Sequence, residues 1–123
     1  DRAAFLAAHD VSRETLAKLD IIIETLDHWR TRSNLIGPNE WPQIWTRHVG
    51  DSVQLLDRIP DTARVVDLGS GAGFPGLILA AARPAGHVTM IESVGKKCAF
   101  LRAAIEAADT QRFPDFLAAW FRD

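Results

Sequence analysis

The chain has 123 residues, of which 47% are hydrophobic and 24% charged, and its formal net charge is −2. This is the composition of one ordinary globular domain, and the low net charge excludes a basic surface spread over the whole molecule. The single cysteine, Cys98, excludes an internal disulfide and favours a reducing, cytoplasmic location. The apolar runs are shorter than the roughly 18 residues of a membrane span. We therefore expect no membrane contact. The histidines and Cys98 lack metal-ligand spacing, so we also expect no bound metal.

Residues 1–60 are predicted to be helical. A short helix over residues 3–9 precedes a long helix that Ser12 caps and that ends near Arg32. Within the long helix, apolar residues recur at three- and four-residue steps, which gives it one buried face.

A loop over residues 34–39 follows, because it contains Gly-Pro and two asparagines. A second helix is expected to begin at Asn39 or Trp41. The sequence Gly-Asp-Ser at 50–52 predicts an interruption, after which an apolar helix continues over 53–59.

From residue 64 the pattern changes to α/β. Strands are predicted over 64–68 and 87–91, each followed by a helix, over 75–83 and 95–108. A strand–helix–strand unit of this length implies parallel pairing. Two strands alone leave both edges of a parallel sheet open, so we expect an incomplete sheet within one domain of 123 residues. The tail, 109–123, has apolar residues at helical spacing and is interpreted as an amphipathic segment. Residues omitted before this tail are one explanation for the missing strands.

The loop after the first strand is the main candidate binding site. An apolar run ends in Asp67, and glycines then follow at every second position up to a proline and a helix. Glycine lets the backbone adopt positive φ and lets a ligand approach closely. The residues expected to bind a nucleotide-type cofactor here are Asp67, Gly69, Ser70, Gly71, Gly73 and Phe74, with Glu92 at the end of the second strand.

Two cofactors compete for this loop. Residues 71–76 match G-x-G-x-x-G, the weak fingerprint of a dinucleotide site. Asp67 favours S-adenosylmethionine instead, because a carboxylate repels a pyrophosphate but attracts an ammonium and a sulfonium. Glu92 suits the ribose hydroxyls of either cofactor. A third interpretation, in which Asp67 only caps the loop or helix, has less support beside so many glycines.

Three blocks of sequence resemble the bacterial small-subunit rRNA methyltransferase G family, also called GidB. The first runs from Asp67 to Gly76 and ends in Phe-Pro-Gly, and the second is Ile-Glu-Ser at 91–93 with the lysines and Phe-Leu that follow. The third comprises Trp29, Asn34-Leu35, Arg47-His48 and Asp51-Ser52. The resemblance covers about residues 10–105. It implies a class I S-adenosylmethionine-dependent methyltransferase, Rossmann-like, with a helical N-terminal extension.

The resemblance also implies a reaction and partners. A methyl group would pass to N7 of a guanine in the 530 loop of 16S rRNA, either naked or in a 30S particle, and the enzyme would be a monomer. N7 already carries a lone pair, so no general base is required. The family also carries an adenine-contacting acid and a later Ser-Arg pair, which residues 106–123 do not provide.

The resemblance assigns a substrate-side role to Asn34, Arg47, His48, Asp51 and Ser52. The residues themselves leave an alternative open, in which Asp51 caps a helix and pairs with Arg47, and Asn34 stabilises a turn. Lys96 and Lys97 could contact RNA phosphates together with other basic residues, or they could simply be solvated.

Two other functions stay open at this point. The residues could form a non-catalytic fragment that binds S-adenosylmethionine or RNA, because strands are missing from the sheet. A nicotinamide-dependent oxidoreductase is the weaker alternative.

Overall fold

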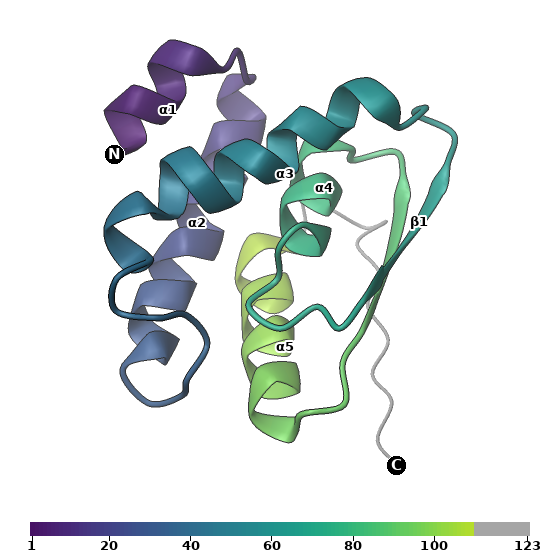
Figure 1. Cartoon of the computed structure of the whole chain (residues 1–123). Coiled ribbons are helices and arrows are strands. Elements are labelled where there is room, and N and C mark those ends of the chain that lie inside the picture. The colour runs from purple at the N-terminus through teal and green to yellow at the C-terminus, as the bar shows by residue number, and fades with distance from the viewer. Residues whose placement is uncertain (110–123) are drawn as a thin grey trace.

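Two parallel strands lie on one side of the molecule, and helices fill the other side (Figure 1). The computed structural model describes residues 1–109. The sheet pairs its strands in register from Arg64 opposite His87 to Leu68 opposite Ile91. The elements of this α/β half are β1 (Arg64–Leu68), α4 (Gly76–Ala82), β2 (His87–Ile91) and α5 (Gly95–Asp109). The predicted strand–helix–strand–helix order and the parallel pairing are therefore confirmed.

The N-terminal half is helical, as predicted. Ser12 caps the long helix, and its Oγ accepts a hydrogen bond from the Thr15 N–H at 3.1 Å. The elements, in chain order, are α1 (Arg2–Ala8), α2 (Arg13–Arg30), the 3₁₀-helix η1 (Trp41–Gln43), the π-helix η2 (Ile44–Val49), α3 (Gly50–Gln54) and the 3₁₀-helix η3 (Leu55–Arg58).

The predicted interruption at residues 50–52 is wrong. Gly50 begins α3 with helical angles, φ −59° and ψ −48°. Its missing side chain leaves room for His9, whose Nε2 would lie 3.3 Å from an added Cβ. Ser52 donates its hydroxyl to the His48 carbonyl oxygen at 2.7 Å, so its polar group is satisfied within the helix. The helix therefore changes type at this point, from π to α, but it does not end.

The apolar core lies between the N-terminal helices and the helices of the α/β half. α2 contacts both α4 and α5, and α3 contacts α4. The predicted apolar face of α2 is confirmed, since Leu19, Ile22 and Leu26 are fully buried. Trp29, at the end of this face, meets Phe100 of α5 edge-on with 6.4 Å between ring centroids. The helical extension thus supports the two helices that back the sheet.

One face of β1 is exposed in the part of the chain that the structure describes. Val66 is 57% exposed and Leu68 is 75% exposed, and alternate residues of a strand point to the same face. The sheet formed by residues 1–109 contains the two predicted strands. The amphipathic segment predicted within 109–123 lies almost entirely outside the described residues.

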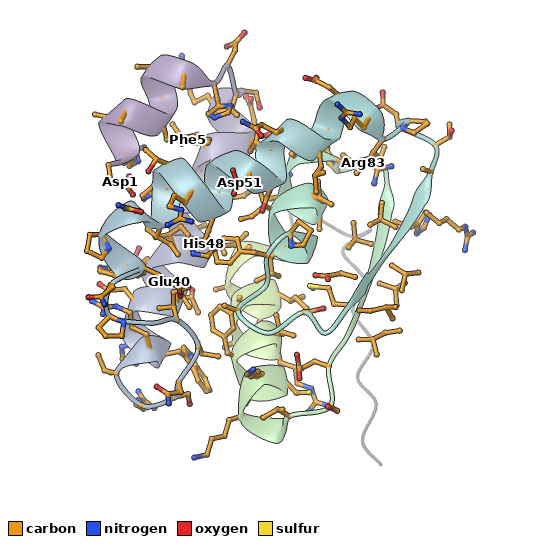
Figure 2. The ribbon with its side chains drawn as sticks, in the orientation of Figure 1. Asp1, Phe5, Glu40, His48, Asp51 and Arg83 are labelled. Atoms are coloured by element: carbon orange, nitrogen blue, oxygen red, sulfur yellow. The ribbon has the colours of Figure 1, made fainter. Side chains whose placement is uncertain are left out.

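A buried arginine fastens the linker before β1 to the end of α4 (Figure 2). The Nη2 group of Arg83 donates to the carbonyl oxygens of Pro60, Asp61 and Ala63 at 2.9, 3.2 and 2.8 Å. Arg83 is 6% exposed, and its Nη2 group is the donor that these three carbonyl oxygens share. The contact fixes where β1 begins and hence the position of Asp67 near the other end of the strand.

We expect Arg83→Ala to lower the free energy of unfolding by about 1–3 kcal/mol, because it leaves backbone carbonyls without a donor. Chemical denaturation of the variant and the parent protein measures this difference. Arg58→Ala is the control, because an exposed arginine on η3 should change stability by less than about 0.5 kcal/mol. Equal effects of the two substitutions would contradict the role of Arg83.

Candidate functional site

The loop between β1 and α4 has the backbone conformation that its glycines predict. Gly69, Gly71 and Gly73 have φ values of +72°, +55° and +91°. A Cβ added at Gly69 would meet no atom within 4 Å, whereas one added at Gly73 would collide with Leu77. The first part of the loop is therefore open for a ligand, and its last part packs tightly onto α4.

Two carboxylates from the ends of the two strands hold the loop. Glu92, just after β2, accepts hydrogen bonds from the Gly71 N–H at 2.7 Å and from the Val94 N–H at 3.0 Å, with one oxygen each. Asp67, in β1, accepts from the Gly76 N–H at 3.0 Å. Both acids thus stabilise the loop, and each carboxylate oxygen keeps a further lone pair for a ligand.

The two carboxylates differ in their proton affinity. Burial raises the pKa of Asp67, and the Gly76 N–H and Ser70 only partly offset this effect, while the charge of Glu92 adds to the rise. Burial also raises the pKa of Glu92, but the N–H groups of Val94 and Gly71 and the charge of Lys97 outweigh it, so the net pKa lies below its usual range. The site therefore retains the Glu92 charge more firmly than the Asp67 charge as pH falls.

Ser70 is buried inside the loop. Its hydroxyl donates to the Asp67 carbonyl oxygen at 3.1 Å, and its N–H donates to the Ile91 carbonyl oxygen at 3.2 Å. The Gly69 N–H donates to the same Ile91 oxygen at 2.8 Å. The Ser70 side chain therefore shapes the loop, and the open surface comes from the glycine backbone.

A cavity of about 310 Å³ lies between the helical N-terminal half and the end of this loop. We call it the helix–loop cavity. The His48 and Phe74 rings pack against each other in its wall, with centroids 5.2 Å apart. Figure 2 shows His48 and Asp51 on the same helical run. Its lining residues are His48, Asp51, Ser52, Leu55, Phe74 and Pro75. Three predicted substrate-side residues are thus brought to the loop residue Phe74.

Arg47 and Asn34 are not among the residues that line this cavity. Arg47 is exposed, and its Nη1 donates to Gln43 Oε1 at 3.4 Å. Asn34 lines a separate cavity of about 300 Å³ together with Glu40, whose carboxylate accepts from the Gly37 N–H. The structure therefore divides the predicted substrate-side group into residues at the loop and residues away from it.

The alternative role for Asp51, as a helix cap paired with Arg47, is wrong. α3 has no side-chain capping hydrogen bond, and the ion pairs among residues 1–109 do not include Asp51. Asp51 is exposed and lies in the helix–loop cavity. Its carboxylate is therefore free to meet a ligand.

The basic residues have different surroundings. Lys96 is exposed in the first turn of α5, and Lys97 lies close enough to Glu92 to lower its pKa. Arg30 is paired with Asp27 at 2.8 Å and stacks over Trp41 at 4.1 Å. The exposed lysine is thus the more available of the lysine pair for contact with a phosphate.

Some features of the site are absent from the sequence-based prediction. Leu55 of the cavity wall follows His48 by seven residues, a helical spacing that could have identified it. The Val94 N–H that donates to Glu92 is a backbone group, so no residue type in the sequence indicates this contact. A larger cavity of about 670 Å³ between α2 and Ala107 contains none of the predicted site residues.

Within residues 1–109, no group of three or more His, Cys, Asp or Glu side chains is arranged to hold a metal ion. None of the helices described in the structure is both long enough and apolar enough to cross a membrane.

Comparison with known proteins identifies the family. The model of the GidB family, described as rRNA small subunit methyltransferase G, matches residues 15–113. The ribosomal RNA small subunit methyltransferase G of Hyphomonas neptunium is 82% identical over 109 residues, which are 89% of this chain and 53% of that protein. The enzymes of the same name from Rhodopseudomonas palustris and Methylobacterium nodulans are 50% and 53% identical, over 85% and 83% of this chain and 46% and 50% of their own lengths.

The chain thus spans about half the length of the curated relatives that it matches. The family model covers the helical extension from residue 15 onward, the glycine loop and both strands. The match therefore includes all the residues that form the loop site and the helix–loop cavity. On this basis the chain belongs to the GidB family of rRNA small subunit methyltransferases G.

Proposed function

We propose that the protein transfers a methyl group from S-adenosylmethionine to N7 of a guanine in the 530 loop of 16S rRNA, with the rRNA or the 30S particle as its partner. The observation that carries the proposal is the glycine loop held between Asp67 and Glu92, in a chain of this family. The mixed α/β arrangement is consistent with a class I methyltransferase fold whose N-terminal extension is helical. A monomeric, cytoplasmic enzyme is part of the same proposal.

The loop residues fit S-adenosylmethionine. Open space at Gly69 and Gly71, whose N–H groups are bonded to Ile91 and Glu92, would let the methionine part approach the loop backbone closely. Asp67 places negative charge where a pyrophosphate would be repelled and a cation attracted. Glu92 can accept from the ribose hydroxyls with the lone pairs that Gly71 and Val94 leave free. These features favour the methyl donor over a dinucleotide.

The remaining residues would position the acceptor base. S-adenosylmethionine supplies a methyl group on a positively charged sulfur, and guanine N7 attacks it with a lone pair. Because N7 carries no proton, the residues need only hold the base in line and stabilise the shifting charge. His48, Asp51, Ser52 and Phe74 would do this at the cavity, while Arg47, Lys96 and Lys97 would contact the RNA around it.

Methyl transfer to unmethylated small-subunit RNA tests this function. The natural protein that contains this chain, labelled S-adenosylmethionine and either naked 16S rRNA or 30S particles should give label at one guanine N7. Replacing the target guanosine with 7-deazaguanosine should abolish incorporation. Label at another atom, or no label with either substrate, would overturn the proposal.

The exposed face of β1 favours a second candidate, in which residues 1–123 bind the cofactor or RNA without transferring the methyl group. Methyl incorporation by residues 1–123 alone would reject this candidate. Binding without incorporation would support it.

The raised pKa of Asp67 predicts how S-adenosylmethionine binding depends on pH. A cationic ligand prefers the ionised carboxylate, so its affinity should rise as pH increases through the raised pKa of Asp67. Glu92 keeps its charge to lower pH, because its pKa is lowered below the usual glutamate range. Calorimetry between pH 4 and 7 measures the change.

Asp67→Asn is the matched control for this titration. The amide of the variant keeps an oxygen for the Gly76 N–H, so the loop should stay in place while the charge is lost. The variant should bind more weakly than the parent at pH 7, with an affinity that is nearly independent of pH. An unchanged pH dependence in this variant would assign the titration to another group.

A further inference from the structure

The helix–loop cavity is large enough to hold a planar base. Its volume of about 310 Å³ lies at the lower end of the range for small-molecule sites, about 300–1,000 Å³. One wall is the helical run from η2 to η3, and the other is the end of the glycine loop at Phe74 and Pro75. A base in this cavity would therefore lie between the helical extension and the loop proposed to bind the methyl donor.

The aromatic wall defines how such a base can lie. His48 and Phe74 already contact each other, with centroids 5.2 Å apart and an interplanar angle of 38°. This separation is within the range of directly packed rings, so a base cannot be inserted between them. It would instead lie against the surface that the two rings form together, which leaves its edges directed toward the helix and the loop.

Asp51 is the charged group of the cavity that is free to read an edge of the base, beside the ring of His48. Ser52 is 3% exposed, and its hydroxyl is used by the His48 carbonyl oxygen. Asp51 is exposed, lines the cavity and takes part in none of the side-chain hydrogen bonds found within residues 1–109. An ionised carboxylate only accepts hydrogen bonds, and its two oxygens can accept two parallel donors.

Guanine is the base whose edge matches this carboxylate. Its N1–H and 2-amino group are two adjacent donors, whereas adenine presents an acceptor at N1 that a carboxylate repels. N7 lies on a different edge of the purine, the one that faces the major groove of a duplex. A guanine whose donor edge faces Asp51 on the helix therefore presents N7 toward the glycine loop.

Resting on the proposed function, we infer that Asp51 is a specificity-determining residue that accepts hydrogen bonds from N1–H and the 2-amino group of the target guanine. The contact selects guanine and at the same time directs N7 to the methyl donor. Asp51 touches the substrate on the edge away from the reacting atom, so it contributes to recognition and orientation and transfers no proton.

A double-mutant cycle between the protein and the RNA tests this contact. Small subunits are reconstituted on 16S rRNA that carries guanosine or inosine at the target position, because inosine lacks only the 2-amino group. With the parent protein, kcat/KM should fall by about 10- to 100-fold from guanosine to inosine, the range for a lost hydrogen bond to a charged group. With Asp51→Ala, activity on guanosine should fall by a similar factor, and inosine should be methylated as well as guanosine.

Asp57→Ala is the matched control. Asp57 is an exposed aspartate on the adjacent η3, and it does not line the helix–loop cavity. It should retain both the activity and the guanosine-to-inosine ratio of the parent protein. S-adenosylmethionine affinity and melting temperature should be unchanged in both variants, because the Asp51 carboxylate makes no hydrogen bond to the rest of the described chain.

The outcomes separate this inference from the proposed function. If Asp51→Ala methylates guanosine at N7 but keeps the parent's preference over inosine, the Asp51 contact is refuted while the function stands. If guanosine is not methylated at N7 by the parent protein, the proposed function itself fails. The inference is supported if the preference for guanosine over inosine is lost in Asp51→Ala and kept in Asp57→Ala.

Discussion

Gly73→Ala is expected to lower the free energy of unfolding by about 2–5 kcal/mol and to abolish S-adenosylmethionine binding. Gly73 has a φ of +91°, and an alanine there is strained in any surroundings. The added Cβ would also collide with Leu77 at the start of the fully buried part of α4. Either the helix or the loop must move, and both movements disturb the site.

Gly69→Ala is the control for this substitution. Gly69 also has a positive φ, +72°, but an added Cβ would meet no protein atom within 4 Å. Gly69→Ala should therefore lower the free energy of unfolding only through the strained backbone conformation, by about 1–2 kcal/mol. Thermal and chemical unfolding, with calorimetry for the ligand, measure both variants. An equal loss of stability in the two would show that the contact with Leu77 is not important.

The same two variants also test where the cofactor binds along the loop. The open space at Gly69 is where we propose that the methionine part of the cofactor approaches the backbone. Gly69→Ala should therefore weaken binding more than its small effect on stability predicts. Binding equal to that of the parent protein would place the cofactor elsewhere along the loop.

The α/β half could be predicted from the sequence because its signals are local. The β-branched run before Asp67, the glycines after it and the apolar helix that follows are each typical of one element. Their order leaves one arrangement, a parallel pair joined by a helix, and β1, α4 and β2 have that arrangement. The identity of the family could be predicted partly for the same reason, since two of its three sequence blocks lie within the α/β half.

The helix around Gly50 was mispredicted because its stability comes from distant contacts. Gly-Asp-Ser is typical of a turn when only neighbouring residues are considered. In the structure Gly50 is buried beside His9 of the N-terminal segment, and Asp1 accepts from the Trp45 N–H at 2.7 Å near the start of η2. Contacts across more than forty residues of sequence cannot be derived from local composition.

The site was predicted well where one loop forms it and less well where the helical half contributes. Three of the five substrate-side residues line the helix–loop cavity, but Asn34 and Arg47 do not, because the register of the π-helix and the path of the preceding loop decide which side chains face it. The roles of the loop residues in binding stay predictions. The nicotinamide alternative is not supported by the family match.

Glu92→Ala is expected to be the most damaging substitution of a charged residue in the site. It would leave the N–H groups of Gly71 and Val94 without their acceptors in two partly buried hydrogen bonds to a charged group, which should cost about 1–3 kcal/mol. The loop would then be held to the end of β2 only by the Gly69 and Ser70 N–H groups on the Ile91 carbonyl oxygen, so S-adenosylmethionine binding should fall at least 10-fold. Denaturation and calorimetry measure the two effects, and Ser93→Ala is the control, because Ser93 is exposed and precedes the same turn.

Glu92→Gln separates the charge of this residue from its shape. The amide can accept one of the two hydrogen bonds, but its NH₂ group then faces the other N–H, so the variant should be destabilised less than Glu92→Ala. The pKa of Glu92 is lowered in the folded protein, so its stabilising contribution is complete above the ordinary glutamate pKa of about 4.3 and is lost as pH falls through the lowered value. The stability of Glu92→Gln should lack this acid-dependent component. If the parent protein and Glu92→Gln lost stability in parallel on acidification, the ionised carboxylate would not be what holds the loop.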